Sequence, residues 1–194
     1  MWGDPHIQTL DGKSYTFNGI GEYTLIESND NFFTLQGRTK RPYIMNTTEL
    51  AKGTVYTAFA LSKNDSETVQ ITLSDTTNTV SIIVNKNSTY NDSNFANGNV
   101  LSFNNLEISK SETKYLISYT SGISAEIEVV TGTLILSLIT SPSLLGITKG
   151  LLGTYNGNVT DDFLRPDGTY LNINATDEEI FHNFGQLCKL ITYF

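Results

Sequence analysis

The sequence predicts an all-β fold, an antiparallel β-sandwich with a short C-terminal helix. Polar and apolar residues alternate with a period of two along most of the chain, which is typical of half-buried strands. Clusters of Asn, Asp, Gly, Ser and Thr separate the alternating runs. Hydrophobic residues make up 39% of the 194 residues and aromatic residues 11%, which is enough for a sizeable core. Strands with one polar face each suit two sheets packed face to face.

The alternating runs define the expected strands in order. Each run places its apolar residues on one face and its polar residues on the other. The expected inward faces are Tyr23 and Leu25; Phe33, Leu35 and Gly37; Val55, Thr57, Phe59 and Leu61; Val69, Ile71 and Leu73; Val80, Ile82 and Val84; Ala125, Ile127 and Val129; and Leu134, Leu136 and Leu138. Tyr15 and Phe17 occupy alternating positions near the N-terminus and are also interpreted as core residues.

Two segments depart from this pattern. The polar segment from Asn85 to Asn99 is expected to be a long surface loop with little structure. The run from Leu134 to Ile147 is the most apolar, but Pro142 and several polar residues interrupt it and it is too short to span a bilayer. We expect a buried strand followed by a loop there, and no transmembrane helix.

One short helix is expected near the C-terminus. Thr176 and Glu179 have the spacing of a capping box, and acidic residues between them favour the positive end of the helix dipole. Gly185 would end the helix. The residues that would face the sheets are Ile180, Phe181 and Phe184.

The charge balance disfavours nucleic acid and anionic membrane surfaces as partners. The net charge is -8 at pH 7 and the pI is about 4.6, which is compatible with cation binding. Charged residues make up only 16%, below the usual share of about a quarter. The polar surface is instead rich in Ser, Thr and Asn, as in many secreted β proteins.

Cysteine usage and sequons bear on the compartment. Cys188 is the only cysteine, so the chain has no internal disulfide, which alone would suggest a reducing compartment. Six Asn-x-Ser/Thr triplets favour a glycosylated, extracellular surface instead. They begin at Asn46, Asn64, Asn87, Asn91, Asn158 and Asn174. Met1-Trp2 leads directly into Gly3-Asp4-Pro5-His6 without a signal peptide, so we expect a segment of a longer protein with Met1 as an added start residue.

The stretch from Gly153 to Phe163 carries oxygen-bearing side chains at near-alternate positions around Gly157 and closes with two adjacent carboxylates, Asp161 and Asp162. Calcium takes six to eight oxygen ligands, which such a loop can supply. The stretch contains no His or Cys, which argues against zinc and softer metals. Asn, Gly and Asp also dominate ordinary turns. The loop alone therefore supports a calcium site and a polar surface loop about equally.

Two groups of motifs lie about a domain apart in the sequence. The N-terminal group comprises Gly3-Asp4-Pro5-His6, Thr9-Leu10-Asp11-Gly12, Phe17-Asn18-Gly19 and Gly21-Glu22-Tyr23. The C-terminal group comprises Gly150-Leu151-Leu152-Gly153, Asp161-Asp162-Phe163, Pro166-Asp167-Gly168-Thr169 and Phe184-Gly185. Together they resemble the von Willebrand factor type D domain, and the segment Leu35-Gln36-Gly37-Arg38-Thr39 resembles its cysteine-poor branch found in membrane mucins and sushi-domain proteins. The resemblance spans nearly the whole chain and implies one domain over residues 1–194, of which the last residues could be truncated.

The resemblance also implies a structural Ca²⁺ ion. The family's ligands correspond here to carboxylates of Asp11, Asp161 and Asp162, a side-chain oxygen of Asn156 and the backbone carbonyl of Asn158. Thr154 stands where the family usually has Asn, so its shorter hydroxyl, its carbonyl or a water would complete the set. The family also tends to carry Trp near Cys188, which this chain lacks.

The Asp4-Pro5 bond is chemically labile because a protonated proline nitrogen is a good leaving group when the aspartate attacks its own carbonyl. Some mucin-type relatives cleave themselves within this motif at acidic pH, and His6 could tune such a step. The alternative is a simple turn into the first strand, which we favour. A self-cleavage would be a single turnover, so no enzyme is predicted. The two His and one Cys make no zinc set, His182 is interpreted as a helix-surface residue, and no nucleophile elbow or phosphate-binding loop is present.

Taken together, the sequence predicts a calcium-stabilised structural or adhesive module of a secreted or cell-surface mucin-like glycoprotein. Its expected partners are other extracellular proteins or neighbouring domains of the same polypeptide, and this segment is not expected to insert into a membrane. The alternative is a self-processing module that cleaves Asp4-Pro5 in acid. A third hypothesis is a lipid-transport setting, because type D domains also occur in large lipoproteins.

Overall fold

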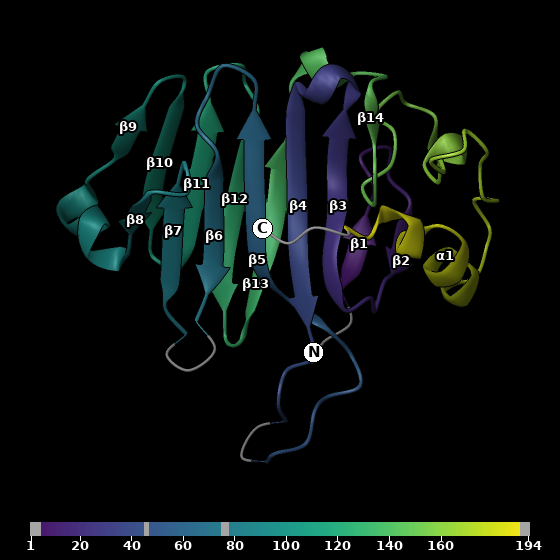
Figure 1. The fold of residues 1–194 in the computed structure, drawn as a ribbon, viewed down its shortest axis with the longest axis horizontal. Helices are drawn as coiled ribbons and strands as arrows, with labels where there is room; N and C mark the ends of the chain where they lie inside the picture. Colours follow the sequence, from purple (N-terminus) through teal and green to yellow (C-terminus); the bar gives the residue numbers. More distant parts are fainter. Residues whose placement is uncertain (1–4, 45–46, 75–77, 191–194) are drawn as a thin grey trace.

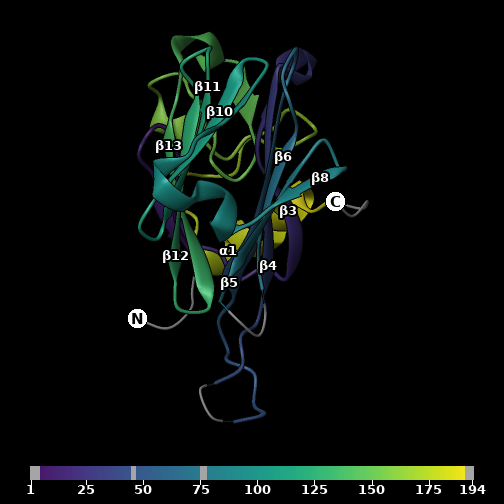
Figure 2. The same cartoon turned by 90° about the vertical axis from the view of Figure 1, so that its left-hand side faces the viewer.

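Two antiparallel sheets pack face to face in the computed structural model, which describes residues 5–44, 47–74 and 78–190 (Figure 1, Figure 2). One sheet has seven strands, in the order β14 (Thr148–Lys149), β3 (Gly21–Ser28), β4 (Phe33–Lys40), β5 (Val55–Lys63), β6 (Val69–Leu73), β7 (Val80–Val84) and β8 (Ser88–Tyr90). The other has five, in the order β13 (Thr133–Ile139), β12 (Ser124–Val130), β11 (Lys114–Tyr119), β10 (Leu106–Ser111) and β9 (Leu101–Phe103). The predicted antiparallel sandwich is confirmed.

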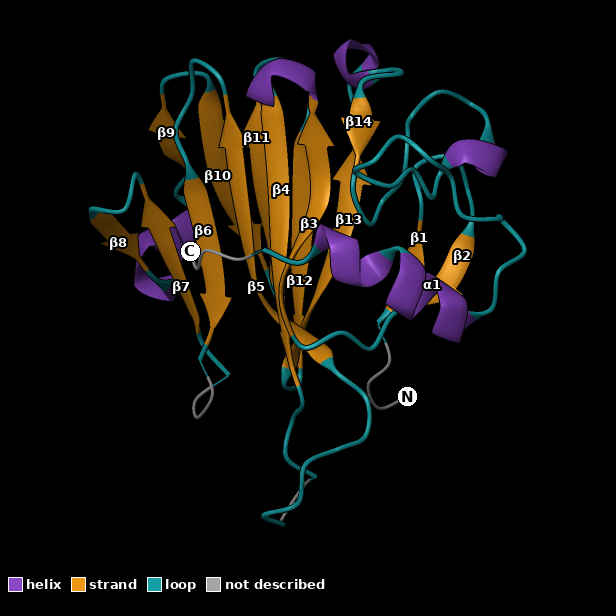
Figure 3. Ribbon diagram, turned by 45° about the vertical axis from the view of Figure 1, so that its right-hand side comes forward, coloured by secondary structure: helices purple, strands orange, loops and turns teal. Residues whose placement is uncertain are grey.

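Smaller elements complete the fold. A two-stranded pair consists of β1 (His6–Gln8) and β2 (Ser14–Thr16). Figure 3 shows this pair and helix α1 (Asp177–Asn183) at one end of the molecule, and β8 and β9 at the other. The 3₁₀-helices are η1 (Asn29–Asn31), η2 (Asp92–Gly98), η3 (Pro142–Leu144), η4 (Val159–Asp161) and η5 (Gly185–Cys188). Among the described residues, no helix combines the length and apolar character needed to cross a membrane.

The core lies between the two sheets and is built from the faces that alternation predicts. Leu35 on β4 is paired with Leu61 on β5, and both are fully buried. Burying one such side chain contributes roughly 1.5–3 kcal/mol. Tyr15 and Phe17 join this core as expected, and Phe17 packs edge-on against Tyr23 with ring centroids 4.9 Å apart. Strands β9 to β11 lie outside the predicted runs, and they contribute Leu106, Ile108, Tyr115 and Ile117 to the core.

The expectation of an unstructured loop from Asn85 to Asn99 is wrong. This segment contains β8 and η2, and the Asn91 side chain caps η2 in a capping box with Asn94. Phe95 is buried and packs edge-on against Tyr115, 5.8 Å between ring centroids. One buried aromatic and a cap therefore order a segment whose composition alone indicates a loop.

The buried strand followed by a loop that the apolar run predicts is present, but the strand is buried on one face only. This segment forms β13, which is the outer strand of the five-stranded sheet. Leu134 faces the core, whereas Ile135 is 47% exposed and Ile139 is 65% exposed. The composition of this run predicts a buried strand because residues on both faces of the edge strand are aliphatic.

The predicted C-terminal helix is confirmed as α1. Thr176 is its N-cap and forms a capping box with Glu179, and Ile180 is buried. The helix ends at Asn183 with Phe184 as its C-cap, directly before Gly185 as expected, although Gly185 lacks the positive φ that is common for a helix-terminating glycine. A Cβ on Gly185 would collide with the Phe17 ring, so the glycine serves close packing against the core.

Candidate metal site

The β1–β2 turn places Asp11 at one side of the candidate site. The Thr9 amide donates to the Lys13 carbonyl at 2.8 Å, which closes the turn, and Gly12 adopts a φ of 104° that favours glycine. The Leu10 amide then donates to the Leu152 carbonyl at 2.9 Å. The turn is thereby joined to the segment that leads into the loop 153–163, although the two are far apart in sequence.

The loop 153–163 is held at both ends. Gly153 has a φ of 77°, and a Cβ at this position would lie 2.7 Å from Asp162 Cγ. Asn158 caps η4 by accepting a hydrogen bond from the Thr160 amide at 3.3 Å. Phe163 follows the two carboxylates and is fully buried, with its ring 5.3 Å from that of Tyr15. These constraints direct both carboxylates toward the β1–β2 turn.

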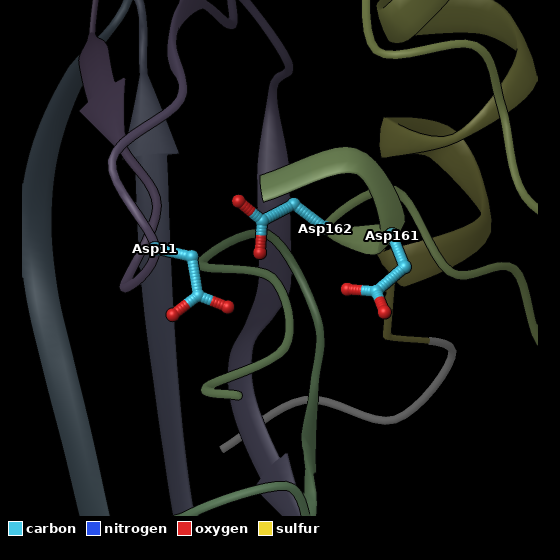
Figure 4. A group of neighbouring side chains, drawn as sticks. All are labelled: Asp11, Asp161 and Asp162. Atoms are coloured by element: carbon cyan, nitrogen blue, oxygen red, sulfur yellow. The ribbon is translucent and has the colours of Figure 1, made fainter. Parts of the chain in front are cut away.

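Three carboxylates converge in this place (Figure 4). Asp11, Asp161 and Asp162 each offer an oxygen, and these oxygens all lie within 4.8 Å of one another. At 4 Å and an effective dielectric of about 20, two like charges repel by roughly 4 kcal/mol. Among the recorded ion pairs of the described residues, none involves these three carboxylates. The arrangement therefore concentrates negative charge that the described side chains do not neutralise.

Backbone amides compensate Asp11 in part. The Asn156 amide donates to Asp11 Oδ2 at 3.0 Å, and the Gly157 amide donates to Asp11 Oδ1 at 2.9 Å. These two bonds fasten the start of the chain to the loop across more than 140 positions of sequence. The carboxylate of Asp11 thus has a fixed orientation, as expected for a ligand or for a structural cap.

Asp162 is the buried member of the cluster, with 1% of its surface exposed. The Thr9 hydroxyl donates to Asp162 Oδ2 at 2.6 Å. Burial raises the pKa of Asp162 to about 6, and the neighbouring charges of Asp11 and Asp161 add to the rise, against the hydrogen bonds from Thr9 and Thr154. A nearby cation would favour the ionised form of this carboxyl.

The remaining predicted ligands surround Asp161. The Thr154 hydroxyl donates to Asp161 Oδ1 at 2.6 Å. The side-chain amides of Asn156 and Asn158 donate to Asp161 Oδ2 at 3.0 and 3.1 Å. The Asn156 side-chain oxygen accepts from the Asn158 amide, and the Asn158 carbonyl accepts from the Asp161 amide. All six predicted ligand residues thus lie together, joined by hydrogen bonds within the cluster.

Sequence reasoning missed Thr9, whose hydroxyl contacts the buried carboxylate. A signal for it exists, because Thr9 continues the alternation of Pro5 and Ile7 and is therefore buried on the same side. A polar residue on an apolar strand face needs a hydrogen-bond partner. Asp162 provides that partner.

The other predicted positions lie away from this cluster. Asp4 lies outside the described residues, Pro5 is buried, and His6 begins β1 with its ring Nδ1 3.2 Å from the Thr16 hydroxyl. His182 is exposed on α1. The described sequon residues Asn64, Asn87, Asn91, Asn158 and Asn174 are all exposed, and Asn46 lies outside the described residues.

Comparison with known proteins places the chain among relatives of much greater length. A family model described as von Willebrand factor type D domain matches residues 1–169. The chain is 32% identical over 198 residues to human Mucin-4, which covers 98% of this chain and 4% of that protein. It is 31% identical over 210 residues to human Sushi domain-containing protein 2, covering 100% of this chain and 24% of that protein. Protein mesh of Bombyx mori is 26% identical over 208 residues, covering 98% of this chain and 13% of that protein.

Proposed function

This chain belongs to the family of von Willebrand factor type D domains, and we propose that it is a calcium-stabilised, non-enzymatic adhesion module of an extracellular glycoprotein. The observation that carries the proposal is the convergence of Asp11, Asp161 and Asp162 with their oxygens within 4.8 Å. Residues 1–194 act as one module within a secreted or cell-surface protein. Its partners are other extracellular proteins or neighbouring domains.

The donor set fits a hard cation. The three carboxylates and the Thr154 hydroxyl lie together, and the Asn156 side-chain oxygen and the Asn158 carbonyl belong to the same loop, where they accept from the Asn158 and Asp161 amides. Calcium prefers such donors and tolerates irregular geometry, whereas magnesium demands a near-ideal octahedron. The carboxylates would hold the ion, and the ion would offset their mutual repulsion.

The ion's role in this proposal is structural. Bound calcium would tie the β1–β2 turn, which carries Asp11, to the loop 153–163. Extracellular modules bind calcium with dissociation constants of about 10⁻⁴–10⁻³ M. At a free concentration ten times the dissociation constant, binding adds about 1.4 kcal/mol to the free energy of unfolding. This contribution matters in a chain whose single cysteine cannot form an internal disulfide.

Surface properties support the extracellular, non-catalytic part of the proposal. The five described sequon residues are exposed and accessible to glycosylation. The net charge of -8 disfavours anionic partners such as nucleic acid. The family membership favours binding over catalysis.

Thermal unfolding with calcium and with a chelator tests the proposal. We expect calcium to raise the midpoint by about 3–5 °C for a stabilisation near 1.4 kcal/mol. Asp161→Asn should abolish this difference. Asp92→Asn is the matched control, since it removes the same charge from a carboxylate outside the cluster, and its calcium response should equal that of the unmodified protein. A midpoint indifferent to calcium would refute the calcium site.

Self-processing at Asp4-Pro5 is the second candidate. It is favoured by His6, which directly follows Pro5 of this bond. The His6 side chain is exposed, and its Nδ1 lies 3.2 Å from the Thr16 hydroxyl oxygen. Intact mass after incubation at pH 5 measures the cut. An unchanged mass after days would exclude it, and Asp4→Ala provides the uncleavable control.

A further inference from the structure

A groove of about 750 Å³ lies between the outer strand β13 and the β1–β2 pair. Strand β1 and strand β13 lie on the same side of the seven-stranded sheet (Figure 2). The two strands form the walls of the groove, and Leu25 on β3 and Phe59 on β5 contribute to its floor. Leu152 closes one end, where its carbonyl accepts the Leu10 amide. The groove is distinct from the carboxylate cluster.

The β13 wall presents backbone groups that no described strand pairs, although the Leu134 carbonyl accepts a hydrogen bond from the Thr133 hydroxyl at 3.4 Å. In an antiparallel ladder, successive residues direct their N–H and C=O groups alternately to the two sides. The Val129 amide donates to the Thr113 carbonyl on the β11 side, so Glu128 and Val130 are the residues that bond to β13. Their partners on β13 are Ile135 and Thr133. The backbone groups of the intervening residues therefore face the groove, and these are Leu134, Leu136 and Leu138.

The opposite wall has the same property. The Thr9 amide donates to the Lys13 carbonyl and the Phe17 amide donates to the Pro5 carbonyl, so Pro5 and Thr9 bond toward β2. By alternation, the backbone groups of His6 and Gln8 face away from β2, and both residues line the groove. Among the described residues, no strand pairs with either of these two edges. The groove is thus bounded by two open strand edges.

The lining combines apolar side chains with uncharged polar ones. No Asp, Glu, Lys or Arg is among the described residues that line it, and its titratable members are His6 and Tyr56. Thr54 lies in the floor, is 1% exposed, and its hydroxyl oxygen has no hydrogen-bond partner among the described residues. A buried hydroxyl without a partner is costly, and a polar backbone group of a ligand that reached it would supply the missing hydrogen bond. The chemistry selects an uncharged occupant with polar backbone groups.

We propose that this groove binds an extended, uncharged peptide strand of a partner protein by strand addition to β13. The strand would pair its backbone with Leu134, Leu136 and Leu138, and its alternate side chains would lie on the apolar floor. This inference rests on the proposed adhesive function and names the class of partner. A second copy of the chain is a poorer occupant, because two chains that each carry a net charge of -8 repel one another.

The test uses two blocked, fluorescein-labelled octapeptides, one alternating Thr and Val and one alternating Ser and Leu. Each has a matched peptide with two central prolines, which remove backbone donors and disfavour pairing. We expect at least one alternating peptide to bind with a dissociation constant below 1 mM, on the order of typical weak peptide recognition, and its proline partner to bind at least tenfold more weakly. Hydrogen exchange should slow at the amides of Leu134, Leu136 and Leu138 when peptide is added.

Two variants locate the binding. Leu136→Glu places a charge in the groove and should weaken binding more than tenfold. Ile139→Glu places the same charge on the same strand at a residue that does not line the groove and is 65% exposed, and it should leave binding unchanged. Should Leu136→Glu fail to fold, Thr54→Val serves instead, because it removes the unpartnered hydroxyl at nearly constant volume and should weaken binding about fivefold.

Several results would overturn the proposal. These are no binding by either alternating peptide, equal binding by the proline peptides, or protection of the β13 amides before any peptide is added. Concentration-dependent protection together with a doubled mass in solution would assign the groove to a second copy. If the β13 amides are protected without peptide and lose this protection when residues 1–4 are deleted, the groove binds the chain's own N-terminus instead. Peptide binding is measured both with calcium and with chelator. The test of the groove can therefore be interpreted even if the protein does not bind calcium.

Discussion

The loops at the two ends of the sandwich are built from the same residue types but differ in how their carboxylates are neutralised. In the segment 85–99, Asp92 accepts a hydrogen bond from the Tyr115 hydroxyl and lies 3.9 Å from the Lys110 ammonium. In the loop 153–163, Asp161 and Asp162 instead face a third carboxylate, Asp11. The carboxylate of the first loop has a hydrogen-bond donor and a cationic side chain within the protein. The second loop concentrates negative charge that a cation would balance.

The two loops otherwise share their construction, which makes them matched controls for one another. Each contains a 3₁₀-helix capped by the side chain of an asparagine, Asn91 or Asn158. Each is anchored by a buried phenylalanine, Phe95 or Phe163. The comparison teaches that composition does not define a cation site. The candidate site rests instead on the convergence of carboxylates from distant parts of the chain.

The largest expected effect is the loss of the aromatic anchors. Phe163→Ala and Phe95→Ala should each lower the free energy of unfolding by about 3–5 kcal/mol, because a large buried ring leaves a cavity. Only Phe163→Ala should also weaken the calcium response, since Phe163 follows Asp162 directly and fixes its backbone. Urea denaturation with calcium and with chelator measures both quantities. A calcium response that survives Phe163→Ala would show that the cluster is held independently of this anchor.

Glycine substitutions separate backbone strain from crowding of the carboxylate. Gly98 and Gly153 have nearly equal φ angles, 76° and 77°, so an alanine at either position meets a similar backbone penalty of about 1–2 kcal/mol. A Cβ on Gly98 meets nothing within 4 Å, whereas a Cβ on Gly153 lies 2.7 Å from Asp162 Cγ. Gly153→Ala should therefore destabilise more than Gly98→Ala and alone disturb calcium binding, as measured by denaturation and calorimetric titration. Equal losses would mean that Asp162 moves aside freely.

These contrasts also mark how far the sequence alone could predict the molecule. Alternation identifies strands such as Phe33–Lys40 because one face is buried and the other is not. It fails for β13, where Ile135 and Ile139 on the outer face are as apolar as the leucines on the inner face. It also fails for the segment 85–99, whose order depends on a single buried side chain, Phe95.

The candidate site likewise has features that the local sequence predicts and features that depend on the fold. Spacing within 153–163 indicates a cation loop and an ordinary turn about equally, because Asn, Asp and Gly serve both. The meeting of Asp11 with Asp161 depends on how β1, β2 and Leu152 pack, which local sequence does not encode. The family resemblance supplied that expectation, and the structure brings the residues together. The hydrogen bond from Thr9 to Asp162 required the register of β1.

The buried carboxyl predicts a pH dependence confined to the calcium-candidate end. Burial raises the pKa of Asp162 to about 6 from its ordinary value of 3.8, so the folded protein binds a proton more readily than the unfolded chain. In chelator, the stabilising contribution of protonated Asp162 is fully present below pH 3.8 and is lost as the pH rises through about 6. One pKa unit corresponds to about 1.4 kcal/mol, and we expect a change of that order.

Denaturation of the chelated protein between pH 4 and pH 7 measures this contribution as the difference from Asp162→Asn, which does not titrate. Calcium binding should correspondingly weaken below pH 6, because the ion and the proton compete for the same carboxylate. Asp92→Asn is the control that removes a carboxylate outside the cluster. A difference between the unmodified protein and Asp162→Asn that stays flat with pH would show that Asp162 is ionised throughout.

The smallest expected effect concerns the two asparagine caps. Asn91 accepts from the Ser93 amide at 3.0 Å, and Asn158 accepts from the Thr160 amide at 3.3 Å. Replacing either by alanine should cost about 1 kcal/mol in the free energy of unfolding, since each exposes one orphan amide. Asn91→Ala should leave the calcium response intact. Asn158→Ala should also retain it, because the proposed ligand at this position is the backbone carbonyl, which the substitution keeps. Loss of the response in Asn158→Ala would instead mean that its side-chain amide, which donates to Asp161 at 3.1 Å, orients the carboxylate for the ion.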